Sequence, residues 1–194
     1  MINKLFDNLP ILFIDEFIIA IDKPSGLLSI QDGHHPEFPY VKEMLEKVYQ
    51  RIWTIHRLDK YTSGVLVFAR DANTHRALNI IFEKRLVIKQ YIAVVYGILD
   101  KREFIIHEPL SKNGDHRHRT IINHVQGKPA KTIIRVLKKY STVTLVQAKP
   151  QEGFTHQIRA HLAYIHHPIV GDNLYAFDRN SLPQKKDFQN VFTL

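Results

Sequence analysis

The stretch IHRLDKYTSGVLVFAR, residues 55–70, gathers charged side chains immediately before an apolar run. Its carboxylate, Asp59, lies between the cations Arg57 and Lys60. Neighbouring cations favour the ionised form of a carboxyl group, and an ionised aspartate can act as a nucleophile or as an electrostatic stabiliser. The alternative is that Asp59 caps a turn by bonding the backbone near Thr62, a common role for aspartate. Spacing alone leaves both hypotheses open.

A second group of candidate residues lies in EGFTHQIRAHLAYIHHPIVGD, residues 152–172. Here Thr155 is expected to cap a helix that begins at His156, with Arg159 one turn further on. A guanidinium at that position can bind a carboxylate or a phosphate through paired hydrogen bonds, or it can form an ordinary surface ion pair. His156 and His161 are five positions apart rather than four, so they do not share a helical face and no metal site is expected.

An aromatic residue opens the strand-like run KQYIAVVYGIL, residues 89–99. Strand alternation places Tyr91, Ala93 and Val95 on one face. An aromatic side chain in a buried strand is usually part of the core. In a functional role, Tyr91 would stack on a base and offer its hydroxyl group.

The polar segment KNGDHRHR, residues 112–119, carries three cations among its histidines: Lys112, Arg117 and Arg119. Cations in such a loop contact phosphates whatever the base sequence, because their binding releases counterions from the nucleic acid. The segment is therefore either a solvated loop or an arm that becomes ordered on RNA.

The remaining pattern predicts the elements that would hold these residues. Strands are expected at 11–14, 17–21, 64–69 (buried on both faces), 89–99, 131–140 and 142–150. Helices are expected at 41–49, from an N-cap at Asp71 through Lys84 with Leu78, Ile81 and Phe82 buried, and at 156–165 with Ile158, Leu162 and Ile165 on one stripe. Many strands and few helices predict an α+β fold, a largely antiparallel mixed β-sheet with flanking helices, in one domain over residues 1–194.

The amino-acid composition limits the classes of partner and of site chemistry that are expected. A net charge of +8 favours a polyanion, nucleic acid first, although ordinary solubility charge is the alternative. The absence of cysteine excludes disulfides, cysteine-ligated zinc and a thiolate nucleophile. We find neither the layout of a secretion signal nor the apolar stretch of about 18 residues that a membrane span needs, so a soluble, cytoplasmic protein is expected.

Taken together and in order, these stretches resemble the RluA-type family of pseudouridine synthases. The resemblance rests on IIAIDKPSGLLS, HRLDKYTSGVLVFA, KQYIAVVYG, GKPAKTIIRVL and EGFTHQIRAHLAYIHHPIVGDNLY, and it runs from about residue 11 to 175. It implies the pseudouridine synthase catalytic fold and the isomerisation of a specific uridine to pseudouridine in structured ribosomal or transfer RNA. It also implies the short form of the family, without an S4 domain.

The resemblance implies a role for each matching residue. Asp59 matches the catalytic aspartate that attacks the sugar or the base while the N-glycosidic bond is cleaved. Arg57 matches an arginine that occupies the gap left by the flipped base. Tyr91 matches the tyrosine that packs on the target base and helps to remove a proton late in the reaction. Arg159 matches the arginine that pairs with the catalytic carboxylate.

The remaining expectations concern partners. The expected RNA contacts are Arg57, Lys112, Arg117, Arg119 and His156. Isomerisation needs neither a redox change nor a group donor, so no cofactor and no metal are expected, and the family resemblance favours a monomer. Phe154 replaces a basic residue that the family usually has, and the chain is expected to be short or divergent after about residue 176.

Two other functions are compatible with the sequence. The first is an RNA-binding or ribosome-assembly factor that keeps the fold and has lost turnover. The second is a metal-independent ribonuclease that uses two of the 12 histidines as acid and base.

Overall fold

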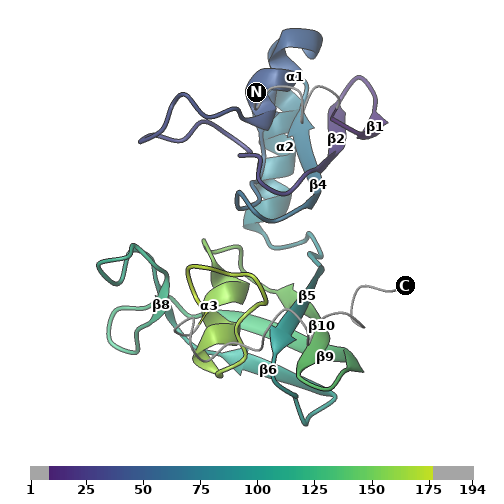
Figure 1. Cartoon of the computed structure of the whole chain (residues 1–194). Helices are drawn as coiled ribbons and strands as arrows, with labels where there is room; N and C mark the ends of the chain where they lie inside the picture. Colours follow the sequence, from purple (N-terminus) through teal and green to yellow (C-terminus); the bar gives the residue numbers. More distant parts are fainter. Residues whose placement is uncertain (1–8, 177–194) are drawn as a thin grey trace. The chain divides into compact units, whose positions relative to one another are not determined.

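The computed structural model describes residues 9–176. The chain divides into two compact units, with the boundary between Val87 and Ile88 (Figure 1). The first unit holds β1 (Ile11–Ile14), β2 (Ile18–Lys23), α1 (Val41–Tyr49), β3 (Trp53–Thr54), β4 (Gly64–Ala69) and α2 (Ala72–Glu83). The second holds β5 (Tyr91–Tyr96), β6 (Glu103–His107), β7 (Leu110–Ser111), β8 (Ile121–Ile122), β9 (Lys131–Lys139), β10 (Val143–Pro150) and α3 (Gln157–Tyr164). The expected single domain over 1–194 stays a prediction.

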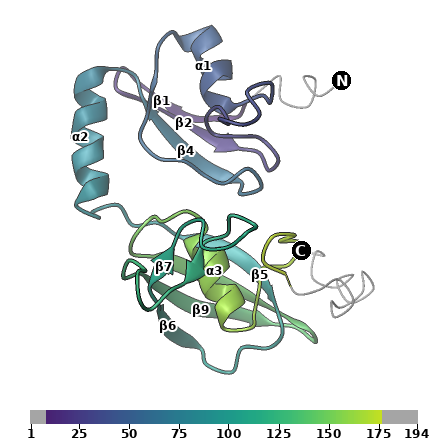
Figure 2. The ribbon, with the colours of Figure 1, turned by 90° about the vertical axis from the view of Figure 1, so that its left-hand side faces the viewer.

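The first unit is built on a four-stranded sheet in the order β1-β2-β4-β3, with β2 and β4 at its centre. Large, fully buried apolar side chains alternate along these two strands: Ile19, Ile21, Leu66 and Phe68. Figure 2 shows α1 and α2 beside this sheet, and α2 contacts β4 and β3. The sheet therefore fixes the two loops at the end of β2 and the start of β4.

Two burial predictions for this unit were wrong. β4 forms as expected, but Val65 is 59% exposed, so only the face that carries Leu66 and Phe68 is covered along its whole length. Similarly, α2 begins after an Asp71 cap, yet none of its residues is fully buried and Ile81 is 38% exposed. Periodicity identifies the apolar face of an element, whereas the depth of burial depends on what packs against that face.

The second unit packs α3 against the sheet β5-β10-β9-β6 (Figure 2). Leu162 of α3 is fully buried among strand residues of this core, and Ile158 and Ile165 pack against it. The predicted apolar stripe of the helix is thereby confirmed. Phe154, the departure from the family pattern, packs in a neighbouring cluster that includes Ala160 of α3.

The start of α3 differs from the prediction. The helix begins at Gln157, and its N-cap is His156, not Thr155. His156 has a φ of 56°, in the left-handed region, and makes no side-chain cap hydrogen bond. The Thr155 carbonyl instead accepts a hydrogen bond from the Thr120 hydroxyl. This tertiary contact holds the chain where it enters the helix.

Buried polar side chains fix α3 on the sheet. The Gln157 side-chain amide donates to the Lys131 carbonyl at 2.9 Å. The imidazole of His161, one turn later and fully buried, lies between the Thr132 hydroxyl and the Glu108 carbonyl, at 2.8 and 3.0 Å. A carbonyl can only accept, so Nε2 of His161 carries the proton and the hydroxyl donates to Nδ1. These contacts set the rotation of α3 and therefore the direction of Arg159.

The predicted α+β class is confirmed. Every strand-to-strand ladder in residues 9–176 is antiparallel, and the parallel contribution there is an isolated bridge between Leu28 and Tyr40. The strands form two four-stranded sheets and a two-stranded ribbon of β7 and β8. No helix within this described range is long and apolar enough to cross a membrane.

Candidate active site

Asp59 lies in the loop that leads into β4, beside the turn that follows β2. The antiparallel pairing of β2 with β4 places Lys23 opposite Gly64, so the segments beyond these residues run side by side. The Thr62 amide donates to the Asp59 carbonyl at 3.0 Å and closes a turn whose tip is Lys60 and Tyr61. This main-chain hydrogen bond closes the turn that carries Asp59.

Hydrogen bonds from the segment 25–29 hold the backbone on both sides of Asp59. The Ser29 hydroxyl donates to the Leu58 carbonyl at 2.8 Å and accepts from the Leu58 amide at 3.1 Å. The Gly26 amide donates to the Lys60 carbonyl at 2.8 Å. Gly26 has a φ of 89°, which other residues adopt only with strain. The backbone that carries Asp59 is therefore fixed before any ligand binds.

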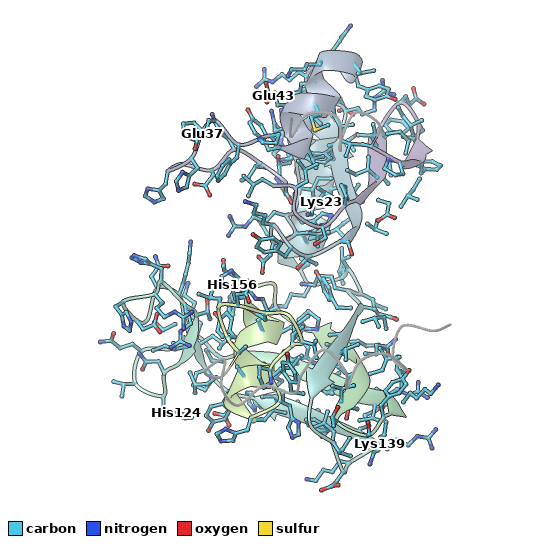
Figure 3. The ribbon with its side chains drawn as sticks, in the orientation of Figure 1. Lys23, Glu37, Glu43, His124, Lys139 and His156 are labelled. Atoms are coloured by element: carbon cyan, nitrogen blue, oxygen red, sulfur yellow. The ribbon has the colours of Figure 1, made fainter. Side chains whose placement is uncertain are left out.

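Lys23 is the third component of this support. It is fully buried at the end of β2 (Figure 3). Its Nζ donates to the carbonyls of Leu27, Pro24 and Lys60 at 2.7, 3.0 and 3.1 Å, which satisfies all three ammonium protons. Burial lowers the pKa of Lys23 to about 8, and the nearby charge of Asp59 opposes this change. Lys23 thus places a positive charge near Asp59 and ties together the two loops.

The altered pKa of Lys23 predicts a pH dependence of stability. Between about pH 8 and the ordinary lysine value of 10.5, the unfolded chain holds a proton that the folded chain has lost. Raising the pH through this range therefore favours folding. We expect the free energy of unfolding of the wild type to rise relative to Lys23→Met by up to about 3 kcal/mol, since each pKa unit corresponds to about 1.4 kcal/mol.

Urea denaturation at a series of pH values measures this difference. Lys47→Met, at an exposed position of α1, is the matched control and should show no comparable trend. A constant difference between wild type and Lys23→Met from pH 8 to pH 10.5 would contradict the assigned environment of Lys23.

The residues before Asp59 are also held in place. His56 accepts a hydrogen bond from the Val67 amide at Nε2, at 3.1 Å, and its ring stacks on Phe82 of α2 with 5.2 Å between ring centroids. Leu58 is buried, whereas Arg57 is exposed. Anchored and outward-facing residues therefore alternate along this part of the chain. Arg57 lies at the surface, two residues before Asp59.

In the second unit, Tyr91 is the first residue of β5 and pairs with Ala148 of β10. It is half-buried, whereas Val95 on the same face is fully buried in the core and Ile92 on the other face is 60% exposed. Tyr91 therefore lies at the margin of the core face. This position suits both hypotheses made for it, a packing residue and an aromatic platform.

Arg159 of α3 binds Asp172 through two parallel hydrogen bonds. Its Nε and Nη2 atoms donate to the two carboxylate oxygens at 2.7 and 2.9 Å, which engages part of its five N–H groups. Burial would raise the pKa of Asp172, but hydrogen bonding and charge from Arg159, with the amides of Leu174 and Tyr175, outweigh it and lower that pKa. The ion pair fixes the guanidinium plane.

Tyr175 brings several predicted residues of the second unit together. The guanidinium carbon atoms of Arg159 and Arg119 lie 5.0 and 5.9 Å from the centroid of its ring. Its hydroxyl donates to the Thr120 carbonyl, so His156 must donate to that hydroxyl from Nδ1, at 3.2 Å. Figure 3 shows His156 at the start of α3. Tyr175 therefore acts as the centre of a basic cluster.

The loop 112–119 has more internal order than a solvated loop requires. Asp115 accepts hydrogen bonds from the amides of Arg117 and Arg119 and from the Arg119 side chain, the last at 2.6 Å. The Arg117 side chain reaches the Asn173 carbonyl. Lys112 and Arg117 remain exposed. The RNA contacts predicted for this loop and for Arg57 and His156 stay predictions.

Sequence reasoning missed three residues that organise these sites: Lys23, Asp172 and Tyr175. All three lie in stretches that carry the family resemblance, IDKPSG and GDNLY, and that was the available signal. Asp59 belongs to the first unit, while Tyr91 and Arg159 belong to the second, so the predicted pairing of Arg159 with Asp59 stays a prediction. No group of three or more His, Asp or Glu side chains suited to a metal ion occurs in the described part of the chain.

Comparison with known proteins identifies the family. A sequence profile described as RNA pseudouridylate synthase matches residues 17–164, most of the chain. The chain belongs to the RNA pseudouridine synthase family. It is 37% identical over 172 residues to the dual-specificity RNA pseudouridine synthase RluA of Vibrio vulnificus, covering 86% of this chain and 68% of that protein.

Further relatives agree. The ribosomal large subunit pseudouridine synthase D of Nitrosomonas europaea is 37% identical over 86% of this chain and 49% of its own length. Among solved structures, human RNA pseudouridylate synthase domain containing 1 superposes with a TM-score of 0.77 at 26% identity, covering 91% of this chain and 74% of that one. The predicted RluA-type resemblance is confirmed, and the chain is an RNA pseudouridine synthase, an isomerase. The alternative of an RNA-binding factor without turnover is not favoured.

Proposed function

We propose that this pseudouridine synthase isomerises a uridine in a ribosomal or transfer RNA stem–loop, with Asp59, Tyr91 and Arg159 as its catalytic residues. One observation carries the proposal for Asp59. Its backbone is held from both sides by Ser29, Gly26 and buried Lys23, so the carboxylate needs little reorganisation to meet a substrate. Preorganised charge of this kind lowers the barrier of a reaction that develops charge at the sugar or the base.

The chemistry balances within the substrate. The bond between uracil N1 and the ribose breaks, the base turns over, and a bond forms between uracil C5 and the same ribose carbon. The C5 proton leaves and N1 gains a proton, so the product has the same atoms as the substrate. No electron or group donor is required, which is why we propose that the enzyme works without a cofactor.

Each proposed residue has a role in one step of this reaction. The target uridine must leave its stack before its glycosidic bond is accessible, and the exposed Arg57 would fill the space it leaves. Asp59 would attack the sugar or the base as the bond breaks. Arg159 would steer and stabilise that carboxylate, with its own guanidinium already fixed by Asp172. Tyr91 would pack on the base and assist the later loss of the C5 proton.

This role for Tyr91 predicts the effect of Tyr91→Phe. Phenylalanine keeps the ring and the position at the start of β5, and it removes only the hydroxyl. We expect turnover to fall by about 10²- to 10⁴-fold, the usual contribution of a general acid or base, while the KM for RNA stays within about threefold. Steady-state kinetics of C5 proton release measures both values, and a wild-type turnover number in Tyr91→Phe would show that the hydroxyl has no chemical role.

The partners follow from the same proposal. Matching relatives are named as a dual-specificity RNA enzyme and as a large ribosomal subunit enzyme. We therefore propose ribosomal or transfer RNA as the substrate, contacted by Lys112, Arg117, Arg119 and His156 in the second unit, and a monomer acting in the cytoplasm. Single-stranded loops rather than continuous duplex would supply the target, since only unstacked bases expose their edges for recognition.

Tritium release tests the proposed function. The 194-residue chain is incubated with ribosomal and transfer RNA transcripts labelled with tritium at C5 of uridine, and the RNA is then digested to nucleosides. The proposal predicts tritium release in equal amount to pseudouridine formed, from at least one of the two RNA classes. RNA binding without release from either class would contradict it, and strand scission would favour a ribonuclease.

A further inference from the structure

Lys60 and Tyr61 lie at the tip of the turn that begins at Asp59, and the proposed chemistry leaves both side chains unused. Tyr61 is 75% exposed. Its carbonyl accepts a hydrogen bond from the Ser25 hydroxyl at 2.9 Å, and the Lys60 carbonyl accepts from Gly26 and Lys23 at 2.8 and 3.1 Å. The turn therefore presents an exposed aromatic ring from a rigid backbone, two residues after Asp59.

The ring is part of a cluster of aromatic and cationic side chains. The Lys60 ammonium lies 4.5 Å from the centroid of the Phe38 ring and 5.7 Å from that of Tyr61. The His35 ring stacks on Phe38, with 5.1 Å between centroids and 25° between planes. We call His35, Phe38, Lys60 and Tyr61 the stacking cluster.

The stacking cluster joins the Asp59 turn to a projecting loop. Figure 3 shows Glu37 on this loop, which extends outward from the body of the first unit, and the Glu37 carboxylate lies 3.2 Å from Nδ1 of His35. Lys60 packs its ammonium against Phe38 of that loop, so the cation is positioned between the loop and the turn. The cluster is thus a prearranged surface rather than a set of scattered side chains.

An unpaired nucleotide is the ligand that fits this chemistry. Every nucleobase has a π-face that stacks on an exposed aromatic ring, and this stacking tolerates any sequence. A neighbouring ammonium supplies charge for the phosphate of the same nucleotide. An aromatic ring on a fixed backbone loses little conformational freedom when a base covers it, which increases the net gain on binding.

We propose that the stacking cluster holds an unpaired nucleotide next to the target uridine, with its base on Tyr61 and its phosphate at Lys60. The inference rests on the proposed role of Asp59, because the position of the cluster beside that residue is what makes the bound nucleotide a neighbour of the target. The cluster then selects RNA in which the target uridine is flanked by at least one unstacked base.

Binding of a fluorescent RNA tests the proposal. Short oligouridylates carrying a single 2-aminopurine report stacking directly, since the fluorescence of this base changes when it stacks. We expect Tyr61→Ala to weaken binding by roughly 5- to 100-fold and to lose the fluorescence change, whereas Tyr61→Phe stays within about twofold of wild type. Lys60→Ala should weaken binding and reduce the dependence of affinity on salt concentration.

Phe17→Ala is the matched control. Phe17 is an exposed aromatic residue of the same unit, and it lies next to Ile18, at the opposite end of β2 from Lys23. Its removal should leave both affinity and fluorescence unchanged. Thermal unfolding of each variant checks that the fold is retained, which we expect for Tyr61→Ala because the side chain is largely exposed.

The outcomes separate this inference from the proposed function. If the wild type forms pseudouridine while Tyr61→Ala keeps wild-type affinity, KM and fluorescence change, the stacking cluster has another role and the inference is overturned. If Tyr61→Ala loses RNA affinity and stacking while the wild type forms no pseudouridine, the nucleotide site stands and the proposed catalytic function fails.

Discussion

Replacement of Asp59 by alanine is expected to abolish pseudouridine formation, with turnover lowered by about 10⁴-fold or more. Losses of this size are typical when a residue that takes part in bond making and breaking is removed. RNA affinity should change by less than about threefold. The side chain is small, and the main-chain bonds that hold the turn come from Ser29, Gly26 and Lys23 and survive the substitution. The Asp59→Ala protein should therefore bind RNA without converting uridine to pseudouridine.

Tritium release and a filter-binding assay on the same RNA measure these two quantities. Asp22→Ala is the control, since Asp22 is an exposed carboxylate of β2 immediately before Lys23, and it should retain nearly full activity. A large loss of RNA affinity in Asp59→Ala would mean that the residue binds or shapes the RNA site and would overturn its proposed chemical role.

The second large effect is expected for Arg159→Met, which should destabilise the protein and stop turnover together. The substitution leaves the Asp172 carboxylate, whose side chain is 6% exposed, without its ion-pair partner. An uncompensated buried charge of this kind costs about 3–5 kcal/mol. For a chain of this size that loss corresponds to a fall of roughly 10 °C in the melting temperature.

A double variant separates the structural part of this effect from the catalytic part. Asp172→Asn removes the charge but keeps an oxygen that can accept from the Leu174 and Tyr175 amides. Arg159→Met combined with Asp172→Asn should therefore recover most of the lost stability and none of the turnover. Recovery of turnover along with stability would show that Arg159 serves only to balance Asp172.

The ion pair of Arg159 with Asp172 also makes the stability of the folded protein depend on pH in the acid range. Because the pKa of Asp172 is lowered in the folded state, its contribution to stability is complete above the ordinary aspartate value near 4 and is lost as the pH falls through the folded value.

Arg135→Met, at an exposed position of β9, is the control for Arg159→Met. It should change the free energy of unfolding by less than about 0.5 kcal/mol.

Local patterns in the sequence predicted the elements well. The β-runs 131–140, with its alternating apolar and charged residues, and 142–150 predicted β9 and β10. The spacing of Ile158, Leu162 and Ile165 predicted the buried stripe of α3. These predictions succeed because periodicity reflects which face of an element meets the core. Burial depth was missed for α2 and for Val65, because it depends on neighbouring elements that no local pattern specifies.

In the candidate site, too, some residues could be identified from the sequence and others could not. Asp59 and Arg159 stood out because charged residues in such positions invite a chemical explanation. Lys23 and Tyr175 did not, because their importance lies in contacts made across the sequence: Lys23 with the carbonyl of Lys60, and Tyr175 with the backbone of Thr120. A lysine at the end of a strand is usually solvated, and only the paired strands β2 and β4 show that this one is buried.

We propose that Asp59 acts when the glycosidic bond breaks and that Tyr91 acts after the new carbon bond has formed. RNA with 5-fluorouridine at the target position separates these two steps, since fluorine replaces the hydrogen whose loss ends the reaction. Digestion and nucleoside chromatography should reveal a rearranged, carbon-linked fluorinated nucleoside with the wild type and with Tyr91→Phe, and none with Asp59→Ala. Formation of that nucleoside by Asp59→Ala would contradict the account.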